Sequence, residues 1–143
     1  MNIKQIDIYL MEMKMKTPFS TSFGTVQNKK FYVVKAIDES GIVGWGEGVA
    51  FEAPWYTEET VETSLHMLEK FLIPLVLHRS IEHPNEVDVL FQSIRRNQMA
   101  KASIEGAVWD AYAKIQNKSL ASVIGGTRTA IDVGISIGIE PTM

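Results

Sequence analysis

Residues 42–49 read Ile-Val-Gly-Trp-Gly-Glu-Gly-Val, and glycine stands at every second position, at 44, 46 and 48. The alternation has the period of a β-strand, in which successive side chains point to opposite faces of the sheet. Glycines weaken a strand, and they usually mark a face that another backbone or side chain approaches closely. The stretch therefore predicts a strand that is closely packed on its glycine face.

Two more strands are expected before this one. Met11, Met13 and Met15 alternate with charged residues, which is the pattern of a half-buried strand with the methionines in the core. Residues 31–37 are rich in aromatic and β-branched residues, and residues 38–41 supply turn chemistry. The first 50 residues therefore predict a three-stranded antiparallel meander.

The middle of the chain predicts three helices. Thr57 is the expected N-cap of the first, Glu58 and Glu59 suit its first turn, and Pro74 is expected to end it. The second helix follows Pro84. The third has many small residues in its apolar face, and Asp110 and Lys114 are spaced on it for an ion pair. The three apolar stripes are Val61, Leu65, Leu68 and Leu72; Val87, Leu90, Phe91 and Ile94; and Ala100, Ile104, Val108, Ala111 and Ile115.

Beyond Gly125 and Gly126 the period changes back to two. Five isoleucines and valines at positions 131–139 alternate with small or polar residues, which predicts a strand with one apolar side. An antiparallel edge strand would have this pattern. So would the first strand of a (β/α)8 barrel, with Gly-Ser-Gly toward the barrel interior.

Composition excludes several functional classes. The 143 residues are 45% hydrophobic and 22% charged, as in a soluble globular domain. The absence of cysteine excludes disulfides, zinc-thiolate sites and cysteine nucleophiles. With a net charge of -3 and no basic cluster, nucleic acid is not an expected partner. No apolar signal core or 18-residue apolar run is present, so we expect a cytoplasmic protein without a membrane partner.

The residues by themselves point to no catalytic group and no metal site. The three histidines have no metal-ligand spacing with a carboxylate. Glu47 and Glu52 are expected to be rim charges or hydrogen-bonded groups, and a catalytic acid is the alternative. Two loops are more informative, because residues 18–24 and 51–56 concentrate aromatic side chains. Such loops serve either as a lid over an apolar ligand or as a plug between sheet and helices.

The order of several motifs resembles the muconate-lactonizing branch of the enolase superfamily over essentially the whole chain. The motifs are residues 17–24, 44–48, 54–60, 100–114, 120–128 and 133–138. Within that branch, residues 54–60, and Gly-Gly-Thr-Arg followed by Val-Gly-Ile-Ser-Ile-Gly, look most like the o-succinylbenzoate synthases, with the N-acylamino acid racemases as close relatives.

The resemblance implies an α+β fold, in which the three-stranded antiparallel meander is followed by a helical bundle. Residues 1–126 would form an enolase-type amino-terminal capping domain, and residues 127–143 the start of a truncated (β/α)8 barrel. The loops would then be a substrate lid. The substrate-binding residues it implies are Phe19, Thr21, Phe23, Phe51, Tyr56 and Ser136.

The resemblance further implies a Mg²⁺-dependent dehydration that begins with proton abstraction next to a carboxylate, on the way to menaquinone. The metal ligands and catalytic lysines would lie in a barrel outside this chain, so the fragment alone is expected to be inactive. Expected partners are a small carboxylate substrate, the barrel in cis and a second copy in a homo-oligomer. An N-acylamino acid racemase or dipeptide epimerase, and a non-catalytic stand-alone binding module, are the alternatives.

Overall fold

The computed structural model describes residues 1–22 and 24–135, and its first part is an antiparallel sheet. Strands β1 (Ile3–Thr21), β2 (Gly24–Asp38) and β3 (Val43–Gly48) pair in the order β1-β2-β3. This confirms the predicted three-stranded meander.

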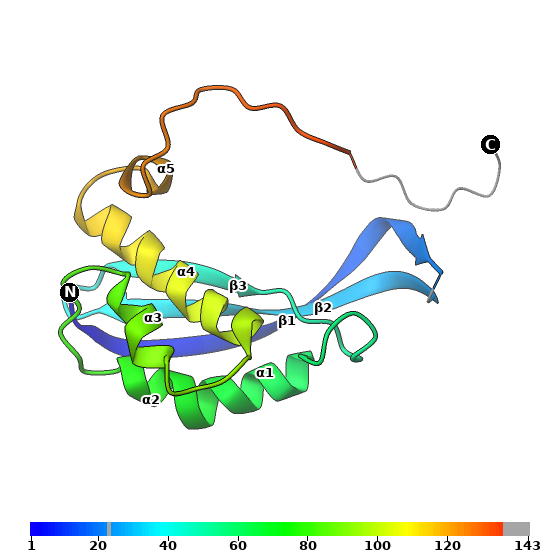
Figure 1. Cartoon of the computed structure of the whole chain (residues 1–143), viewed down its shortest axis with the longest axis horizontal. Helices are drawn as coiled ribbons and strands as arrows, with labels where there is room; N and C mark the ends of the chain where they lie inside the picture. The colour runs from blue at the N-terminus through cyan, green and yellow to red at the C-terminus, as the bar shows by residue number, and fades with distance from the viewer. Residues whose placement is uncertain (23, 136–143) are drawn as a thin grey trace.

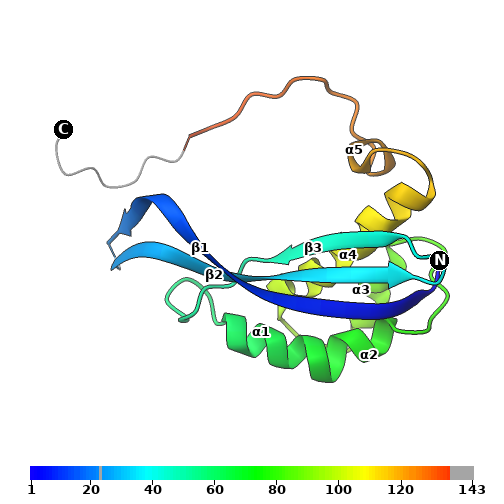
Figure 2. The same cartoon turned by 180° about the vertical axis from the view of Figure 1, so that it is seen from behind.

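Helices follow the sheet, and all but the short last one pack over one of its faces. They are α1 (Val61–Met67), the π-helix η1 (Leu68–Leu72), α2 (Ile73–Val76), α3 (Glu86–Phe91), α4 (Gln98–Ile115) and α5 (Leu120–Val123). Helices α3 and α4 lie in front of the sheet in Figure 1 and behind it in Figure 2. The predicted α+β architecture, with helices after the sheet, is therefore confirmed.

The hairpin of β1 and β2 is longer than expected and extends beyond the end of β3 (Figures 1 and 2). Residues 18–24 were expected to be a loop, but Phe19, Ser20 and Thr21 pair with Val26, Thr25 and Gly24. Regular pairing stops after Lys14 and resumes at Phe19, and the intervening residues bulge out. The bulge accommodates Pro18, which has no N–H to donate to a partner strand.

The methionine stripe of β1 was predicted to lie in the core, but it lies outside it. Met11 is 45% exposed and Met13 54% exposed. The helices cover only the opposite face of the sheet, where Tyr32, Val34 and Ala36 of β2 are buried. The period of two was correct, but it does not tell which face of a sheet is covered.

The glycines of β3 make the close approach that their spacing predicts. A Cβ atom built on Gly44 would lie 2.0 Å from the carbonyl oxygen of Ala107, and one on Gly46 would lie 2.0 Å from that of Ser103. Both carbonyls belong to α4. A Cβ on Gly48 would meet the Tyr32 ring at 1.9 Å. The glycines therefore let α4 lie directly on the strand.

Helix α4 also satisfies polar groups along β3. The Trp45 backbone N–H donates to Asp110 Oδ2 at 2.9 Å, and Lys114 Nζ donates to the Val43 carbonyl at 2.8 Å. Asp110 and Lys114 form the predicted ion pair at 2.7 Å. The pair therefore occupies hydrogen-bonding groups that an edge strand would otherwise expose.

The first helix differs from its prediction at both ends. Its N-cap is Thr60, whose Oγ1 accepts from the Thr63 backbone N–H at 3.2 Å, and not Thr57. The helix also does not end at Pro74, because α2 continues to Val76. A π-helical turn precedes the proline, where the Ile73 N–H donates to the Leu68 carbonyl. This wider turn accommodates the proline ring, which clashes with the preceding turn of a regular helix.

The segment after α5 is not a strand in its described part. Residues 131–135 pair with no described strand, and Ile131, Val133 and Ile135 are 69%, 76% and 85% exposed. A strand forms only where a neighbour accepts its hydrogen bonds, and no described segment lies beside this one (Figure 1). The rest of the expected strand, residues 136–139, lies outside the described residues. The division at residue 126 stays a prediction.

Candidate ligand pocket

An apolar cavity of about 580 Å³ lies where the tip of the β1–β2 hairpin meets the segment after β3 and the start of α4. Its lining residues are Phe19, Thr21, Ser22, Lys29, Val49, Phe51, Trp55, Tyr56 and Met99. The volume lies within the usual range for small-molecule sites. The cavity is the strongest candidate for a ligand site in the described part of the chain.

Four of the six predicted substrate-binding residues meet in this pocket. They are Phe19 and Thr21 from the hairpin, and Phe51 and Tyr56 from the segment after β3. The other two, Phe23 and Ser136, lie outside the described residues.

Sequence reasoning missed the remaining lining residues. Ser22 and Trp55 lie in the two loops that were singled out, so their position was a usable signal. Lys29, Val49 and Met99 come from other segments and reach the pocket only because the hairpin, β3 and α4 converge there. No local pattern in the sequence marks such a convergence.

Three aromatic rings form one wall of the pocket. The Phe51 and Trp55 ring centroids are 4.4 Å apart, and Tyr56 lies edge-on to both at 6.2 Å and 6.1 Å. Tyr56 is 69% exposed, and Phe19, on the opposite hairpin, is 39% exposed. Large apolar side chains with this much solvent-exposed surface are suited to cover a ligand.

Lys29 is the only charged side chain among the described residues that line the pocket. Its Nζ lies 3.1 Å from Glu47 Oε1 and 5.2 Å from the centroid of the Phe31 ring. Glu47 and Glu52 are both exposed and pair with Lys29 and Lys30, which agrees with their expected role as rim charges. The Glu52 carboxylate, through its hydrogen bond and its charge, raises the pKa of Lys30.

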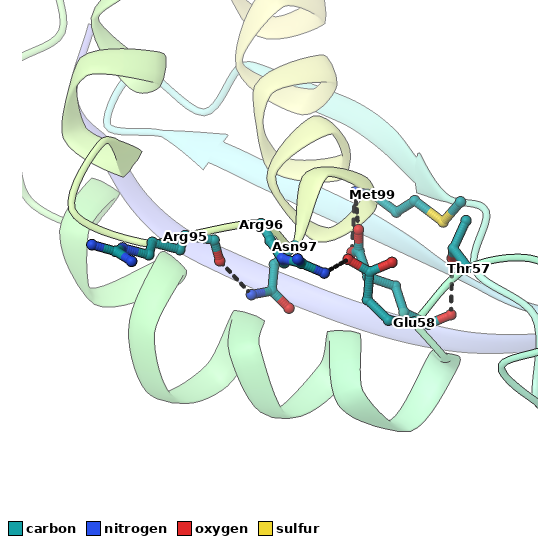
Figure 3. Close-up of polar contacts among 7 residues, drawn as sticks. Thr57, Glu58, Arg95, Arg96, Asn97 and Met99 are labelled. Atoms are coloured by element: carbon teal, nitrogen blue, oxygen red, sulfur yellow. Dashed lines mark hydrogen bonds and ion pairs between the residues drawn. The ribbon is translucent and has the colours of Figure 1, made fainter.

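The aromatic segment is tied to the start of α4 by two glutamates. The buried Glu59 carboxylate accepts hydrogen bonds from the backbone N–H groups of Met99 and Ala100, each at 3.1 Å. Glu58 pairs with Arg96 at 3.1 Å (Figure 3). Hydrogen bonding by its own backbone N–H, followed by Arg96, lowers the pKa of Glu58.

These contacts correct the roles predicted for Glu58 and Glu59. Both were expected in the first turn of a helix that begins after Thr57, but they precede α1. Glu59 instead accepts from the N-terminus of α4, and Glu58 pairs with Arg96 just before that helix. Asn97, the N-cap residue of α4, makes no side-chain cap hydrogen bond, so Glu59 supplies the acceptor from a distant segment. The same contact holds Met99 against the pocket.

The described part of the chain has no cluster of side chains that could hold a metal ion. Within residues 1–22 and 24–135, no group of three or more His, Cys, Asp or Glu side chains could hold a metal ion. His83, for example, packs edge-on against Trp109 and Tyr112 at 5.2 Å and 5.4 Å. No helix in this part of the chain combines the length and the apolar character needed to cross a membrane.

Comparison with known proteins gives a consistent result. Residues 5–125 match the family described as the N-terminal domain of mandelate racemase and muconate lactonizing enzyme. An o-succinylbenzoate synthase of Geobacillus stearothermophilus is 52% identical over 142 residues, which are 99% of this chain and 38% of that protein. An N-succinylamino acid racemase of Thermus thermophilus is 38% identical over 143 residues, which are 100% of this chain and 38% of that protein.

A solved structure shares the fold closely. The crystal structure of an enolase superfamily member from Listeria innocua has a TM-score of 0.93 and 42% identity, over 99% of this chain and 38% of that chain. The chain therefore spans well under half the length of these relatives.

Proposed function

The chain belongs to the N-terminal domain family of mandelate racemase and muconate lactonizing enzyme, in the enolase superfamily, and on that basis we propose that it caps the active site of an o-succinylbenzoate synthase. The observation that carries the proposal is the pocket. Two segments 30 residues apart bring Phe19, Thr21, Phe51 and Tyr56 to one apolar cavity. The greater identity to the synthase than to the racemase, 52% against 38%, favours the synthase reaction.

The proposed task of these residues is to bind, orient and exclude water. The aromatic wall and Phe19 would close over the apolar part of a small carboxylate substrate. Removing water from such a site strengthens the electrostatic interactions that act on the reacting groups. Phe23 and Ser136 are proposed to contribute to the same site.

The described residues do not fit a magnesium site, because none of them form a suitable cluster of ligands. When bound, the metal would stabilise the negative charge that develops as the proton next to the carboxylate leaves. We propose that its ligands, and the lysines that act as base and acid, belong to a (β/α)8 barrel joined to this cap.

The barrel is also proposed to cover apolar residues that this chain leaves exposed. Ile131, Val133 and Ile135 are exposed in this chain, and neighbouring barrel strands and helices would cover them. The complete enzyme is proposed to act in the cytoplasm on the way to menaquinone, alone or as a homo-oligomer.

A racemase of N-acylamino acids is the second candidate function. Its support is the match of this whole chain to 38% of the length of the Thermus thermophilus racemase. A synthase substrate and an acylamino acid both combine a carboxylate with an apolar or acyl portion, so the lining of this pocket suits either one.

The test begins with the intact mass of the natural polypeptide that starts Met1-Asn2-Ile3. We expect a mass far above that of 143 residues, and we expect the purified protein to form o-succinylbenzoate when Mg²⁺ is supplied. Racemisation of N-succinylamino acids without dehydration would favour the second candidate. A mass equal to that of 143 residues, with no activity of either kind, would support a stand-alone binding module and overturn the enzymatic proposal.

A further inference from the structure

Lys29 stands out because its chemistry differs from that of every other described residue in the pocket. The lining is otherwise made of apolar and hydroxyl side chains, and Lys29 is its single cation. A mostly apolar site with one convergent charged group selects ligands that place the opposite charge at that point. We propose that Lys29 selects, among apolar ligands of the pocket, those that carry a carboxylate directed at the hairpin.

Lys29 is held in place by its neighbours, yet a ligand can still reach its ammonium group. The residue lies on β2, where it pairs with Met13 of β1, so its backbone is held within the sheet. Its ammonium group lies 5.2 Å from the Phe31 ring centroid, a cation–π contact that orients the side chain. The side chain is 32% exposed, so a ligand can reach it.

The present partner of Lys29 is easily replaced. Glu47 lies 3.1 Å away, but its side chain is 51% exposed and it is not among the residues that line the cavity. Exposed ion pairs of this kind contribute little, because water solvates both partners. A carboxylate bound in the cavity would meet Lys29 in a less polar environment than Glu47 does, where the attraction between two opposite charges is stronger.

This inference rests on the proposed function, which it deepens. If the barrel holds the reacting carboxylate of the substrate, Lys29 would bind a second carboxylate at the other end of the molecule. A binding measurement on the 143-residue chain tests Lys29 without any need for the dehydration reaction, so the two proposals can fail separately.

The test compares two probes of the same shape, 4-phenylbutyrate and the neutral 4-phenylbutanamide. Each is titrated into dilute ¹⁵N-labelled chain while the indole N–H signal of Trp55, identified by its loss in Trp55→Phe, is followed. We expect the wild-type chain to prefer the acid about fivefold, the ratio expected for one partly exposed ion pair. The preference should disappear in Lys29→Met and persist in Lys29→Arg.

Two further variants separate a specific contact from a change in net charge. Lys30→Met removes the same charge one residue away, and Lys30 pairs with Glu52 and does not line the cavity, so the preference should remain. Glu47→Gln removes the competing carboxylate and should increase the preference. The inference is overturned if neither probe binds, if the wild-type chain binds both equally, or if Lys29→Met and Lys30→Met have the same effect.

Discussion

At the scale of single residues, the buried carboxylate of Glu59 links two segments that are distant in the sequence. Glu59 is 7% exposed and accepts from two backbone N–H groups at the start of α4, 40 residues along the chain. Thr60 lies next to Glu59 and forms a β-bridge with Phe51. This bridge helps to place the N-cap of α1 at Thr60 and not at Thr57. Both threonines are good caps, so the sequence could not discriminate between them.

Glu59→Gln should destabilise the chain. The substitution keeps the shape of the side chain but weakens its hydrogen bonds to the positive end of α4, and we expect the free energy of unfolding to fall by about 1–2 kcal/mol. Urea denaturation measures the difference. Glu58→Gln is the matched control, because the exposed Glu58 pairs only at the surface with Arg96 and its loss should have little effect. Equal effects of the two substitutions would contradict the role given to Glu59.

Asp38 should make stability depend on pH at the acidic end. Burial opposes its ionisation, but hydrogen bonds from the Ser40 hydroxyl and from the Ser40 and Asn2 backbone N–H groups outweigh burial and lower its pKa. A carboxyl group whose pKa is lower in the folded state stabilises the fold above its unfolded pKa of about 3.9, and the contribution is lost as the pH falls through the folded pKa.

The corresponding variant is Asp38→Asn. Its unfolding free energy should fall less than that of the wild-type chain when the pH is lowered from 5 toward 2, as measured by denaturant titrations at each pH. Parallel pH profiles for the two proteins would exclude Asp38 as a source of the dependence.

At the scale of elements, the contact between β3 and α4 organises the domain. Gly46→Ala would place a Cβ atom 2.0 Å from the Ser103 carbonyl oxygen, so helix and strand must separate. We expect a loss of about 1–3 kcal/mol or more in unfolding free energy. Gly106→Ala is the control on the facing helix, because its Cβ would meet its nearest neighbour, the Gly46 Cα, at 3.8 Å.

Gly106→Ala should be neutral or slightly stabilising, since alanine favours a helix by about 1 kcal/mol over glycine. Thermal melts of the two variants measure this difference in stability. If both alanines are tolerated equally, the close approach of α4 is not what the glycines provide.

Much of this element-level structure could be predicted from the sequence. The period of two identified the three strands of the sheet, but it also predicted a strand at residues 131–135, where the structure has none. The apolar stripes identified the helices, and the glycine spacing of β3 indicated the close contact that α4 makes. Other local signals misled. Residues 18–24 were expected to be a loop, but a bulge at Pro18 lets the hairpin continue, and Pro74 was expected to end a helix, but a π-turn accommodates its ring. Both exceptions depend on backbone adjustments that residue type alone does not reveal.

The candidate site was predictable only in part, because it depends on packing. The aromatic loops, together with the family resemblance, predicted Phe19, Phe51 and Tyr56 for this site, and all three line the cavity. Lys29 and Met99 were missed, since they enter the pocket only when the hairpin tip and the start of α4 meet. The methionines of β1 were misplaced for the related reason that the covered face of the sheet is set by distant helices.

At the scale of the whole molecule, the chain presents apolar surface that a partner should cover. Ile131, Val133 and Ile135 are exposed beyond α5, and such a segment favours self-association. We expect the isolated chain to associate as its concentration rises, and we expect replacement of these three residues by serine to reduce the association severalfold. Sedimentation velocity measures both. A wild-type chain that stays monomeric, with sharp amide signals for residues 130–135, would contradict this expectation.

We propose that this chain completes an o-succinylbenzoate synthase active site as its cap. The most direct test is a chimera, in which the 143 residues replace the matching 142 residues of the Geobacillus stearothermophilus synthase, followed by measurement of o-succinylbenzoate formation with Mg²⁺. We expect kcat within about tenfold of the parent enzyme, and a raised KM when Phe19→Ala opens the pocket. A folded chimera that binds Mg²⁺ but forms no o-succinylbenzoate would contradict the claim.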